Sequence, residues 1–220
     1  MTIAREGFPL IGGFLAAAAV FFFLNLTWLG LLCSGLGIFT AFFFRDPERS
    51  PPQGSGVIIS PADGRVVRVA PAPPTNPVGE GAQQVSIFMS VFNVHVNRAP
   101  MSGRIIAVDH RKGEFLPAFD EAASFRNEQN EVVVEADEGG RMAFTQIAGL
   151  IARRIVFRGA VGETLERGAR VGLIQFGSRV DVVLPIHAQP RVTVGQRVRA
   201  GVSVIGEMPC AERAITERPA

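Results

Sequence analysis

Two segments of the chain share one pattern: VGETLERGARV at residues 161–171 and VGQRVRAGVSV at residues 194–204. Each has a Val-Gly pair, an aliphatic residue three positions after that glycine, a second glycine and a final Val, and the two copies lie 33 residues apart. Glycine tolerates the left-handed backbone angles of tight turns, and the aliphatic residues suit a buried face. The repeat therefore predicts tight turns around a hydrophobic core.

Short β-type runs surround this repeat. Many are rich in Val and Ile and are separated by Gly, Pro and polar clusters, which is typical of strands. We predict strands at Val57–Ile59, Arg65–Val69, Val85–Met89, Arg104–Val108, Glu131–Glu135, Met142–Ile147, Arg154–Phe157, Val171–Phe176 and Val180–Leu184. Helical periodicity is weak here, so we expect a mainly β domain with loops at Pro71–Pro77 and Pro117–Asn127.

The repeat resembles the turn pattern of the barrel-sandwich hybrid, the fold of biotinyl and lipoyl carrier domains. No lysine lies between the two copies, since Lys112 is the single lysine of the chain, so the carrier chemistry itself is absent. The interval instead contains Phe176-Gly177-Ser178-Arg179. We therefore expect a barrel-sandwich-hybrid-like domain that does something other than carry a group on lysine.

The N-terminal region is strongly apolar, with no charged residue from Phe8 to Phe44. A spanning helix needs about 20 apolar residues, so this run is too long for one span and barely long enough for two. Asn25 lies near its middle, where a hairpin would turn, and Arg5 and Arg45 flank it. Arginines at both ends favour a hairpin with both ends in the cytoplasm. A cleaved signal peptide is the alternative, but the run is too long for one and lacks a clear cleavage site.

The amino-acid composition excludes several kinds of partner and site. The net charge is only +2 and no basic tract is present, so no nucleic-acid partner is expected. Cys33 and Cys210 lack the spacing of metal ligands, and we expect neither a metal site nor a disulfide. A linker rich in Pro and Gly follows the apolar run. We therefore divide the chain into a membrane-anchoring helical segment, residues 1–46, and a catalytic β domain, residues 47–220.

Three residues are candidates for chemistry, and each also has an ordinary structural interpretation. Ser178 follows Gly177, whose unhindered carbonyl its hydroxyl could attack, but most Gly-Ser pairs are turns. His95 lies between Val94 and Val96 and could act as a base, or it could be a satisfied structural histidine. Asp63 could orient that histidine, but Asp before Gly is common in β-turns. His110 and His187 fit an exposed position and a loop, respectively.

Taken together, three segments resemble the short form of the phosphatidylserine decarboxylases. They occur in the expected order: Ser60-Pro61-Ala62-Asp63-Gly64, Val94-His95-Val96-Asn97-Arg98-Ala99-Pro100 and Phe176-Gly177-Ser178-Arg179-Val180-Asp181. The resemblance extends from about Arg45 to Glu207, and an N-terminal membrane segment is also expected in this family. Many members have Leu-Gly-Ser at the cut, whereas this chain has Phe-Gly-Ser, as the short form does.

The resemblance implies a self-cleaving proenzyme. Asp63 orients His95, His95 activates the Ser178 hydroxyl, and the chain is cut between Gly177 and Ser178 into a β chain, residues 1–177, and an α chain, residues 178–220. Ser178 becomes a covalent pyruvoyl cofactor that forms a Schiff base with phosphatidylserine and accepts electrons as carbon dioxide leaves. The product would be phosphatidylethanolamine, made at the cell membrane by a domain on its cytoplasmic side.

Other interpretations remain open at this point. The chain could be a decarboxylase of archaetidylserine-type lipids, because the head group would be the same. It could also be a non-enzymatic, membrane-anchored barrel-sandwich binding module, which would stay in one piece. A serine hydrolase is disfavoured, since Ser178 lies in no G-x-S-x-G elbow. Whether the chain forms a homo-oligomer is left undecided by the sequence.

Overall fold

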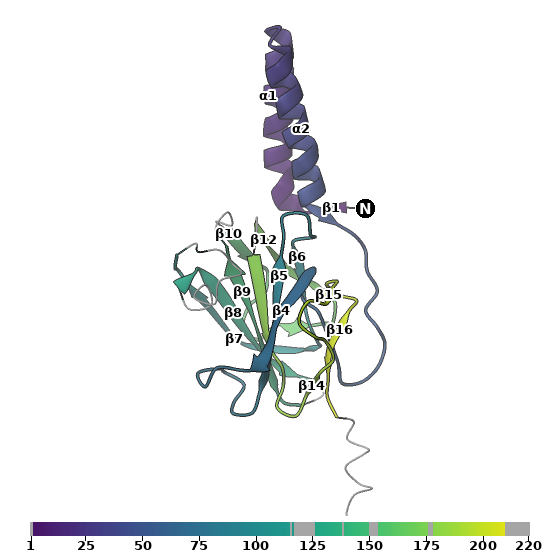
Figure 1. The fold of residues 1–220 in the computed structure, drawn as a ribbon, viewed down its shortest axis with the longest axis vertical. Coiled ribbons are helices and arrows are strands. Elements are labelled where there is room, and N and C mark those ends of the chain that lie inside the picture. The colour runs from purple at the N-terminus through teal and green to yellow at the C-terminus, as the bar shows by residue number, and fades with distance from the viewer. Residues whose placement is uncertain are drawn as a thin grey trace, which may run out of the picture.

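The computed structural model describes residues 2–114, 116, 126–137, 139–149, 154–175 and 178–209. A pair of helices projects from a β domain (Figure 1). The helices are η1 (Arg5–Gly7), α1 (Phe8–Phe23) and α2 (Thr27–Phe43). The strands are β1 (Thr2–Ile3), β2 (Arg45–Asp46), β3 (Val57–Ile59), β4 (Gly64–Pro71), β5 (Gln83–Met89), β6 (Val96–Arg98), β7 (Gly103–Arg111), β8 (Gln129–Ala136), β9 (Arg141–Ala148), β10 (Arg154–Phe157), β11 (Thr164–Leu165), β12 (Arg170–Gln175), β13 (Ser178–Val183), β14 (Gln189–Pro190), β15 (Arg197–Val198) and β16 (Val204–Glu207). The expected mainly β fold with an N-terminal helical hairpin is confirmed.

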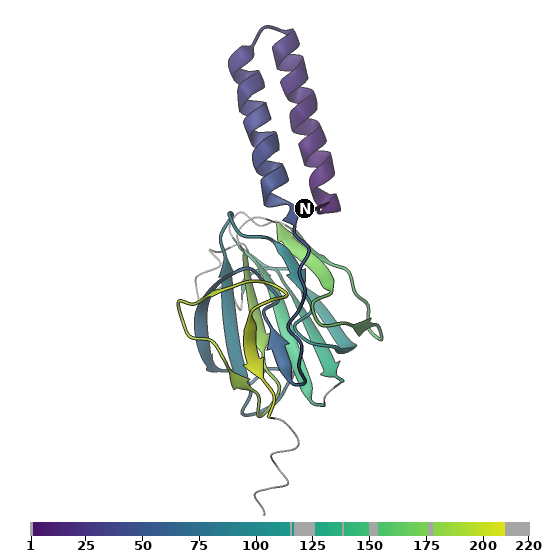
Figure 2. The same ribbon diagram turned by 90° about the vertical axis from the view of Figure 1, so that its right-hand side faces the viewer.

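The hairpin turns where the sequence places its polar break. Asn25 has a φ of 59°, a left-handed angle that asparagine tolerates better than most residues. The two helices pack side by side (Figure 2), and a Cβ on Gly30 would lie 2.6 Å from the Phe22 ring, so this contact requires glycine. At 1.5 Å per residue the helices measure about 24–26 Å, somewhat less than the roughly 30 Å of a bilayer's hydrocarbon core. Among the described residues, the stretch Arg5–Phe23 alone meets the length and apolarity of a spanning helix, and Thr27–Phe43 is shorter.

The β domain consists of one large curled sheet and two small ones. The large sheet has eight strands in the order β11-β7-β8-β9-β13-β5-β4-β15. The small sheets have the orders β10-β12-β6 and β14-β16-β3. One continuous hydrophobic core lies between them. It consists mostly of aliphatic residues and includes Phe144. The sheet β10-β12-β6 lies nearest the hairpin, and β14 lies at the far end of the domain (Figure 1).

The two halves of the domain are related by a pseudo-two-fold axis. Strands β11 and β15, one in each copy of the sequence repeat, form the two opposite edges of the large sheet. All four glycines of the repeat have positive φ, between 75° and 95°, as the turn prediction requires. Pairing is interrupted at corresponding points, after Val66 in β4 and after Ile105 in β7. Residues 57–68 therefore correspond to residues 39 positions later in the chain.

Hydrogen bonds repeat across this axis. Ile59 N donates to Pro100 O and Arg98 N donates to Pro61 O, both at 2.9 Å, so the two turns bind each other reciprocally. Asn97 in β6 pairs with Gly172, and its counterpart Ile58 in β3 pairs with Gly206, each beside a register shift. The same framework is thus built twice from different side chains.

The predicted strands all correspond to observed ones, with shifts of one or two residues at most ends. The sequence did not mark β6, β16 or the two-residue strands as separate elements, because strands of two to four residues have little measurable periodicity. The loop expected at Pro117–Asn127 falls largely outside the described residues, as do Phe176, Gly177 and Cys210.

Candidate active site

Ser178 is the first residue of β13, near the centre of the large sheet. Its side chain is fully buried, and its Oγ donates to Met89 Sδ at 3.4 Å. Met89 is its cross-strand partner on β5. The preceding strand, β12, belongs to a small sheet and ends at Gln175. The expected cut therefore lies where the chain crosses from one sheet to the other.

His95 directly precedes β6 and is 2% exposed. Its Nδ1 lies 3.0 Å from the carbonyl oxygen of Asn93, which can only accept, so Nδ1 carries the hydrogen. Nε2 then holds a lone pair, and it is buried without a hydrogen-bond partner among the described residues. A buried polar atom without a hydrogen-bond partner is uncommon in folded proteins and often has a functional reason. An imidazole fixed in this tautomer is suited to accept a proton.

Burial keeps His95 neutral. The pKa of His95 is lowered to about 4, mainly by the loss of hydration on burial and also by the charge of Arg45. The Asn93 carbonyl and the charge of Asp63 oppose this shift. The ring packs against Phe43 at the end of α2, with centroids 4.1 Å apart. At neutral pH the imidazole is therefore an available base rather than a cation.

Asp63 is held by groups other than the histidine. Arg49 binds both of its carboxylate oxygens, and Ala200 N donates to Oδ1 at 2.8 Å. At the corresponding turn, Ser102 Oγ accepts from Arg167 N at 3.0 Å. The carboxylate thus joins its own segment to the linker and to the second copy of the repeat, and Ser102 Oγ makes the equivalent contact to the first copy.

The three candidates are not joined by hydrogen bonds to one another. Among the described contacts, His95 is oriented by the Asn93 carbonyl, and Ser178 donates to a sulfur. Asp63 acts on His95 through its charge. The segment that carries it lies beside β6, because Arg98 N donates to Pro61 O. The structure therefore brings Asp63 and His95 into one region without direct contact.

Sequence reasoning missed the amide side chains beside Ser178. Asn97 Nδ2 lies 3.9 Å from Met89 Sδ, the atom that also accepts from Ser178. Gln146 Nε2 donates to Asn97 Oδ1 at 2.9 Å, and Asn130 Nδ2 donates to Gln146 Oε1 at 3.2 Å. The sequence did contain one signal for Asn97. It is two residues after His95, and residues two positions apart lie on the same side of an extended chain. Nothing in the sequence linked Gln146 to it.

The other histidines lie away from this region. His110 is exposed, and its Nε2 lies 3.2 Å from Glu128 Oε1. His187 is exposed in a turn with a φ of 73°. Both observations confirm the exposed position and the loop expected from the sequence.

The base of the hairpin packs against the candidate site. Phe43 and Phe44 form a cluster with Val94, Val96 and Leu173, which belong to the β domain. Arg45 Nη2 donates to Phe92 O at 2.6 Å. These contacts put His95 at the end of the domain that faces the apolar helices.

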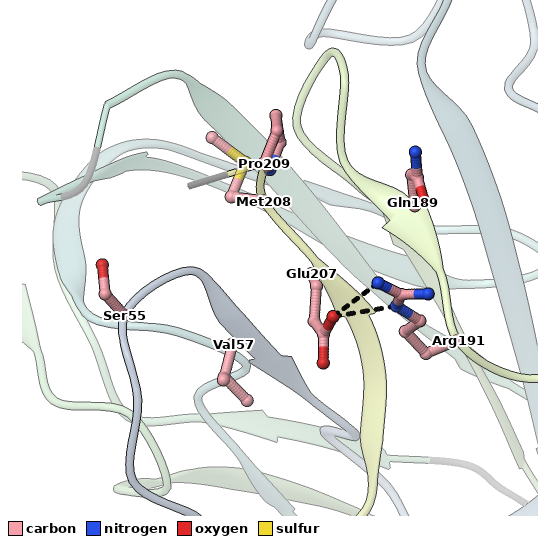
Figure 3. Close-up of a pocket in the computed structure, with 7 residues that line it drawn as sticks. All are labelled: Ser55, Val57, Gln189, Arg191, Glu207, Met208 and Pro209. Atoms are coloured by element: carbon pink, nitrogen blue, oxygen red, sulfur yellow. Dashed lines mark hydrogen bonds and ion pairs between the residues drawn. The ribbon is translucent and has the colours of Figure 1, made fainter. Parts of the chain in front are cut away.

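A surface hollow of about 270 Å³ lies at the opposite end (Figure 3). Its lining includes the ion pair of Arg191 and Glu207, whose closest atoms are 2.8 Å apart. Gly56 lies at this end, and Met208 N donates to its carbonyl as Ile174 N does to that of His95. The hollow is therefore the pseudo-symmetric counterpart of the His95 region, and it contains none of the candidate residues.

Comparison with known proteins identifies the family of the chain. The sequence model of the phosphatidylserine decarboxylase family matches residues 36–206. The phosphatidylserine decarboxylase proenzyme of Pelobacter propionicus is 47% identical over 217 residues, which cover 94% of this chain and 96% of that protein. The proenzyme of Syntrophotalea carbinolica is 48% identical over 204 residues, 93% of this chain and 95% of the relative. That of Symbiobacterium thermophilum is 45% identical over 208 residues, with 94% and 96% covered. The chain belongs to the phosphatidylserine decarboxylase family.

Proposed function

We propose that this protein converts phosphatidylserine to phosphatidylethanolamine after cutting itself between Gly177 and Ser178. The names of its relatives support the substrate and the proenzyme character. The proposal is carried by two features of the same chain: a buried serine hydroxyl at a sheet crossing, and a neutral, buried histidine whose Nε2 has no hydrogen-bond partner among the described residues. A hydroxyl needs such a base to become a nucleophile at neutral pH.

The cut needs only groups of the chain itself and water. His95 Nε2 takes the Ser178 proton, Oγ bonds to the Gly177 carbonyl carbon, and the bond to the Ser178 nitrogen breaks as that nitrogen receives the proton. An ester then joins Gly177 to Ser178 Oγ. Loss of the Ser178 Cα proton expels the Gly177 carboxylate, and water replaces the nitrogen, which leaves as ammonia.

The residue that remains at position 178 would be a pyruvoyl group. It supplies a ketone that reacts with the substrate amine and an electron sink for the decarboxylation. The surroundings of Ser178 fit such a small, neutral group, because the side chain is fully buried and its Oγ contacts Met89 Sδ, to which Asn97 Nδ2 also points. His95 would hold the proton that the product carbon later receives.

Asp63 has an electrostatic part in this proposal. Its charge favours the protonated form of His95, which exists transiently once the Ser178 proton has been taken. Arg49 and Ala200 N fix the carboxylate in place, so its effect on His95 does not depend on a direct hydrogen bond. Arg49 therefore supports the site from the linker that follows the hairpin.

We infer that the hairpin attaches the enzyme to the cytoplasmic face of the cell membrane. Phe23 and Trp28, near its turn, are 86% and 85% exposed, which suits a lipid environment better than water. Both ends of the hairpin lie beside the β domain, and arginines flank it. This arrangement would bring the site to the membrane surface, where the substrate lies.

Intact mass tests the proposal. The purified chain should consist of fragments of about 19 and 5 kDa, by proportion of chain length, and the smaller one should lack a free amine at its N-terminus. Ser178→Ala should remain a single chain and should not release carbon dioxide from phosphatidylserine vesicles. A wild-type protein of unbroken 220-residue mass would overturn the proposal.

A further inference from the structure

A chain of three buried amides ends beside Ser178. Asn130 donates to Gln146, and Gln146 donates to Asn97, at 3.2 and 2.9 Å. Each of the three residues is at most 2% exposed. The far end of the chain, Asn97 Nδ2, and Ser178 Oγ both point to the same atom, Met89 Sδ. The amide donor and the serine hydroxyl therefore share one small region of the core.

The sulfur of Met89 fixes the donor-to-acceptor direction of the hydrogen bonds that link the three amides. A thioether accepts hydrogen bonds and cannot donate them, so the side of Asn97 that faces Met89 must be its NH₂ group. Its carbonyl then faces Gln146, whose own carbonyl faces Asn130. The contact with sulfur is long, at 3.9 Å, so it leaves most of the donor's hydrogen-bonding capacity unused. Asn97 is thus held as a donor toward the surroundings of Ser178.

The other half of the domain shows that the fold does not need Asn97 and Gln146. Ile58 takes the place of Asn97, because each pairs with a glycine beside a register shift. Leu184 takes the place of Gln146, because its N bonds to Gln83 O as Gln146 pairs with Asn130. Both aliphatic residues are fully buried in the core. Burying amides is costly unless they are paired, so the presence of Asn97 and Gln146 where the other half has aliphatic residues points to a function.

We propose that Asn97 is a further catalytic residue for the self-cleavage, which rests on the function proposed above. As Ser178 Oγ bonds to the Gly177 carbonyl carbon, the carbonyl oxygen takes the electron pair, and Asn97 Nδ2 donates a hydrogen bond to it. His95 holds the proton until the nitrogen of Ser178 receives it. Gln146 is a positioning residue that keeps the NH₂ group of Asn97 turned toward this oxygen.

The size of the effect follows from similar donors in other enzymes. Removing one preorganised donor to a developing oxyanion typically slows a reaction by about 10² to 10³-fold. Asn97→Ile should therefore slow the cut by about that factor, and Gln146→Leu, which leaves the donor in place but free to turn, by about tenfold. The two changes together copy the residues of the other half, so the double variant is the one best suited to fold.

The test follows the cut in full-length chains made by cell-free synthesis on phospholipid vesicles, with gel bands quantified over time. The variants are Asn97→Ile, Gln146→Leu, their combination and Asn97→Asp, which keeps the size of the side chain and loses the donor. Gln84→Leu is the matched control, because Gln84 is a buried amide that binds Asp181 on the opposite face of β13. Thermal unfolding of each chain, in a Ser178→Ala background, reports folding separately.

The inference is supported if the double variant unfolds near the parent temperature, cleaves as slowly as Asn97→Ile, and the control cleaves normally. Equal rates in the double and the Asn97→Ile variants would show that Gln146 acts through Asn97, which a purely structural role would not produce. If the double variant is unstable, the Asn97→Asp rate decides. A stable variant without the donor that cleaves at the wild-type rate, or a control that slows equally, overturns the inference alone. A wild-type chain that stays intact overturns the proposed function with it.

Discussion

The two ends of the β domain have the same backbone and opposite chemical character. At the end beside the hairpin lie a histidine, an amide and a serine, all buried. The pseudo-two-fold axis relates them to Gly56 for His95, Ile58 for Asn97 and Gly140 for Ser178. The second end is stabilised by ordinary aliphatic packing, and its described residues form a surface hollow that contains an ion pair (Figure 3). The difference separates what the fold requires from what the chemistry requires.

Removing the imidazole should have the largest effect, because it makes the first end resemble the second. His95→Ala should slow self-cleavage by about 10³-fold, within the range that a general base contributes. The measurement is the ratio of cut to uncut chain over time. His110→Ala and His187→Ala are the controls and should cleave normally. If His187→Ala is slow and His95→Ala is not, the wrong histidine has been assigned.

Asp63 and Ser102 occupy corresponding turns, so the same kind of change can be compared at both. Asp63→Asn keeps an oxygen for Ala200 N but leaves the charge of Arg49 largely unpaired, and we expect a loss of about 3 kcal/mol in unfolding free energy. Ser102→Ala removes one hydrogen bond and should cost about 1 kcal/mol. Urea unfolding of the uncut Ser178→Ala chain gives both values. Equal losses would mean that the ion pair with Arg49 adds nothing to the turn.

The pH dependence of the cut should report how strongly His95, at the end beside the hairpin, is shielded from water. His95 accepts protons only when neutral, and its pKa of about 4 predicts a constant rate from pH 8 to 5 and a fall near pH 4. Phe43→Ala would expose the ring to water and raise its pKa toward the ordinary 6.5. At pH 5.5 this variant should cleave about tenfold slower than at pH 8, while the wild type does not change. Identical pH profiles would show that Phe43 does not shield His95.

The same contact changes what truncation should do. From the sequence, deleting residues 1–44 removes no proposed catalytic residue and should leave self-cleavage possible. In the structure that deletion also removes Phe43, which covers His95. We therefore expect a truncated chain to cut itself at pH 8 and to show the acid sensitivity of Phe43→Ala. A truncated chain with the wild-type profile would contradict this.

The smallest effect is expected at the second end. Arg191→Ala breaks the exposed ion pair with Glu207, and such pairs contribute about 0–1 kcal/mol. Stability should therefore change by less than about 1 kcal/mol, and the rate of the cut should not change at all. A slower cut in this variant would mean that the two ends communicate, and the comparison would no longer separate fold from function.

The sequence predicted the strands and the repeat because both depend on local pattern. Val and Ile runs marked β4, β5 and β7–β9, and the glycines of the repeat have the left-handed angles that their spacing implied. The resemblance to the family connected Ser178, His95 and Asp63 from the sequence alone. Their mutual geometry was beyond reach, because contacts such as those of Asn93 with His95 and of Arg49 with Asp63 depend on how separate segments pack.

The missed amides show the same limit. Asn97 was visible in the motif, but only the structure places Gln146, which is 49 residues away in the chain, within hydrogen-bond distance of it. A buried glutamine in a strand looks the same in a sequence as an exposed one. The sequence also reveals only part of the pseudo-symmetry. The repeat at residues 161–171 and 194–204 can be recognised in it, whereas the correspondence of Ile58 with Asn97 cannot.

The central place of β13 in the large sheet has a consequence for the molecularity of unfolding. The α chain would contain β13, which lies between β9 and β5, together with β15 on β4 and β16 on β3. The proposed cut would therefore turn a single chain into two chains that share the same sheets. Unfolding of the precursor is a unimolecular event, whereas the mature protein must release a partner, so its midpoint should rise with protein concentration. After dilution of the unfolded fragments, reassembly would be a bimolecular, second-order reaction. Refolding of the mature enzyme should therefore be slower in dilute solution than refolding of the precursor.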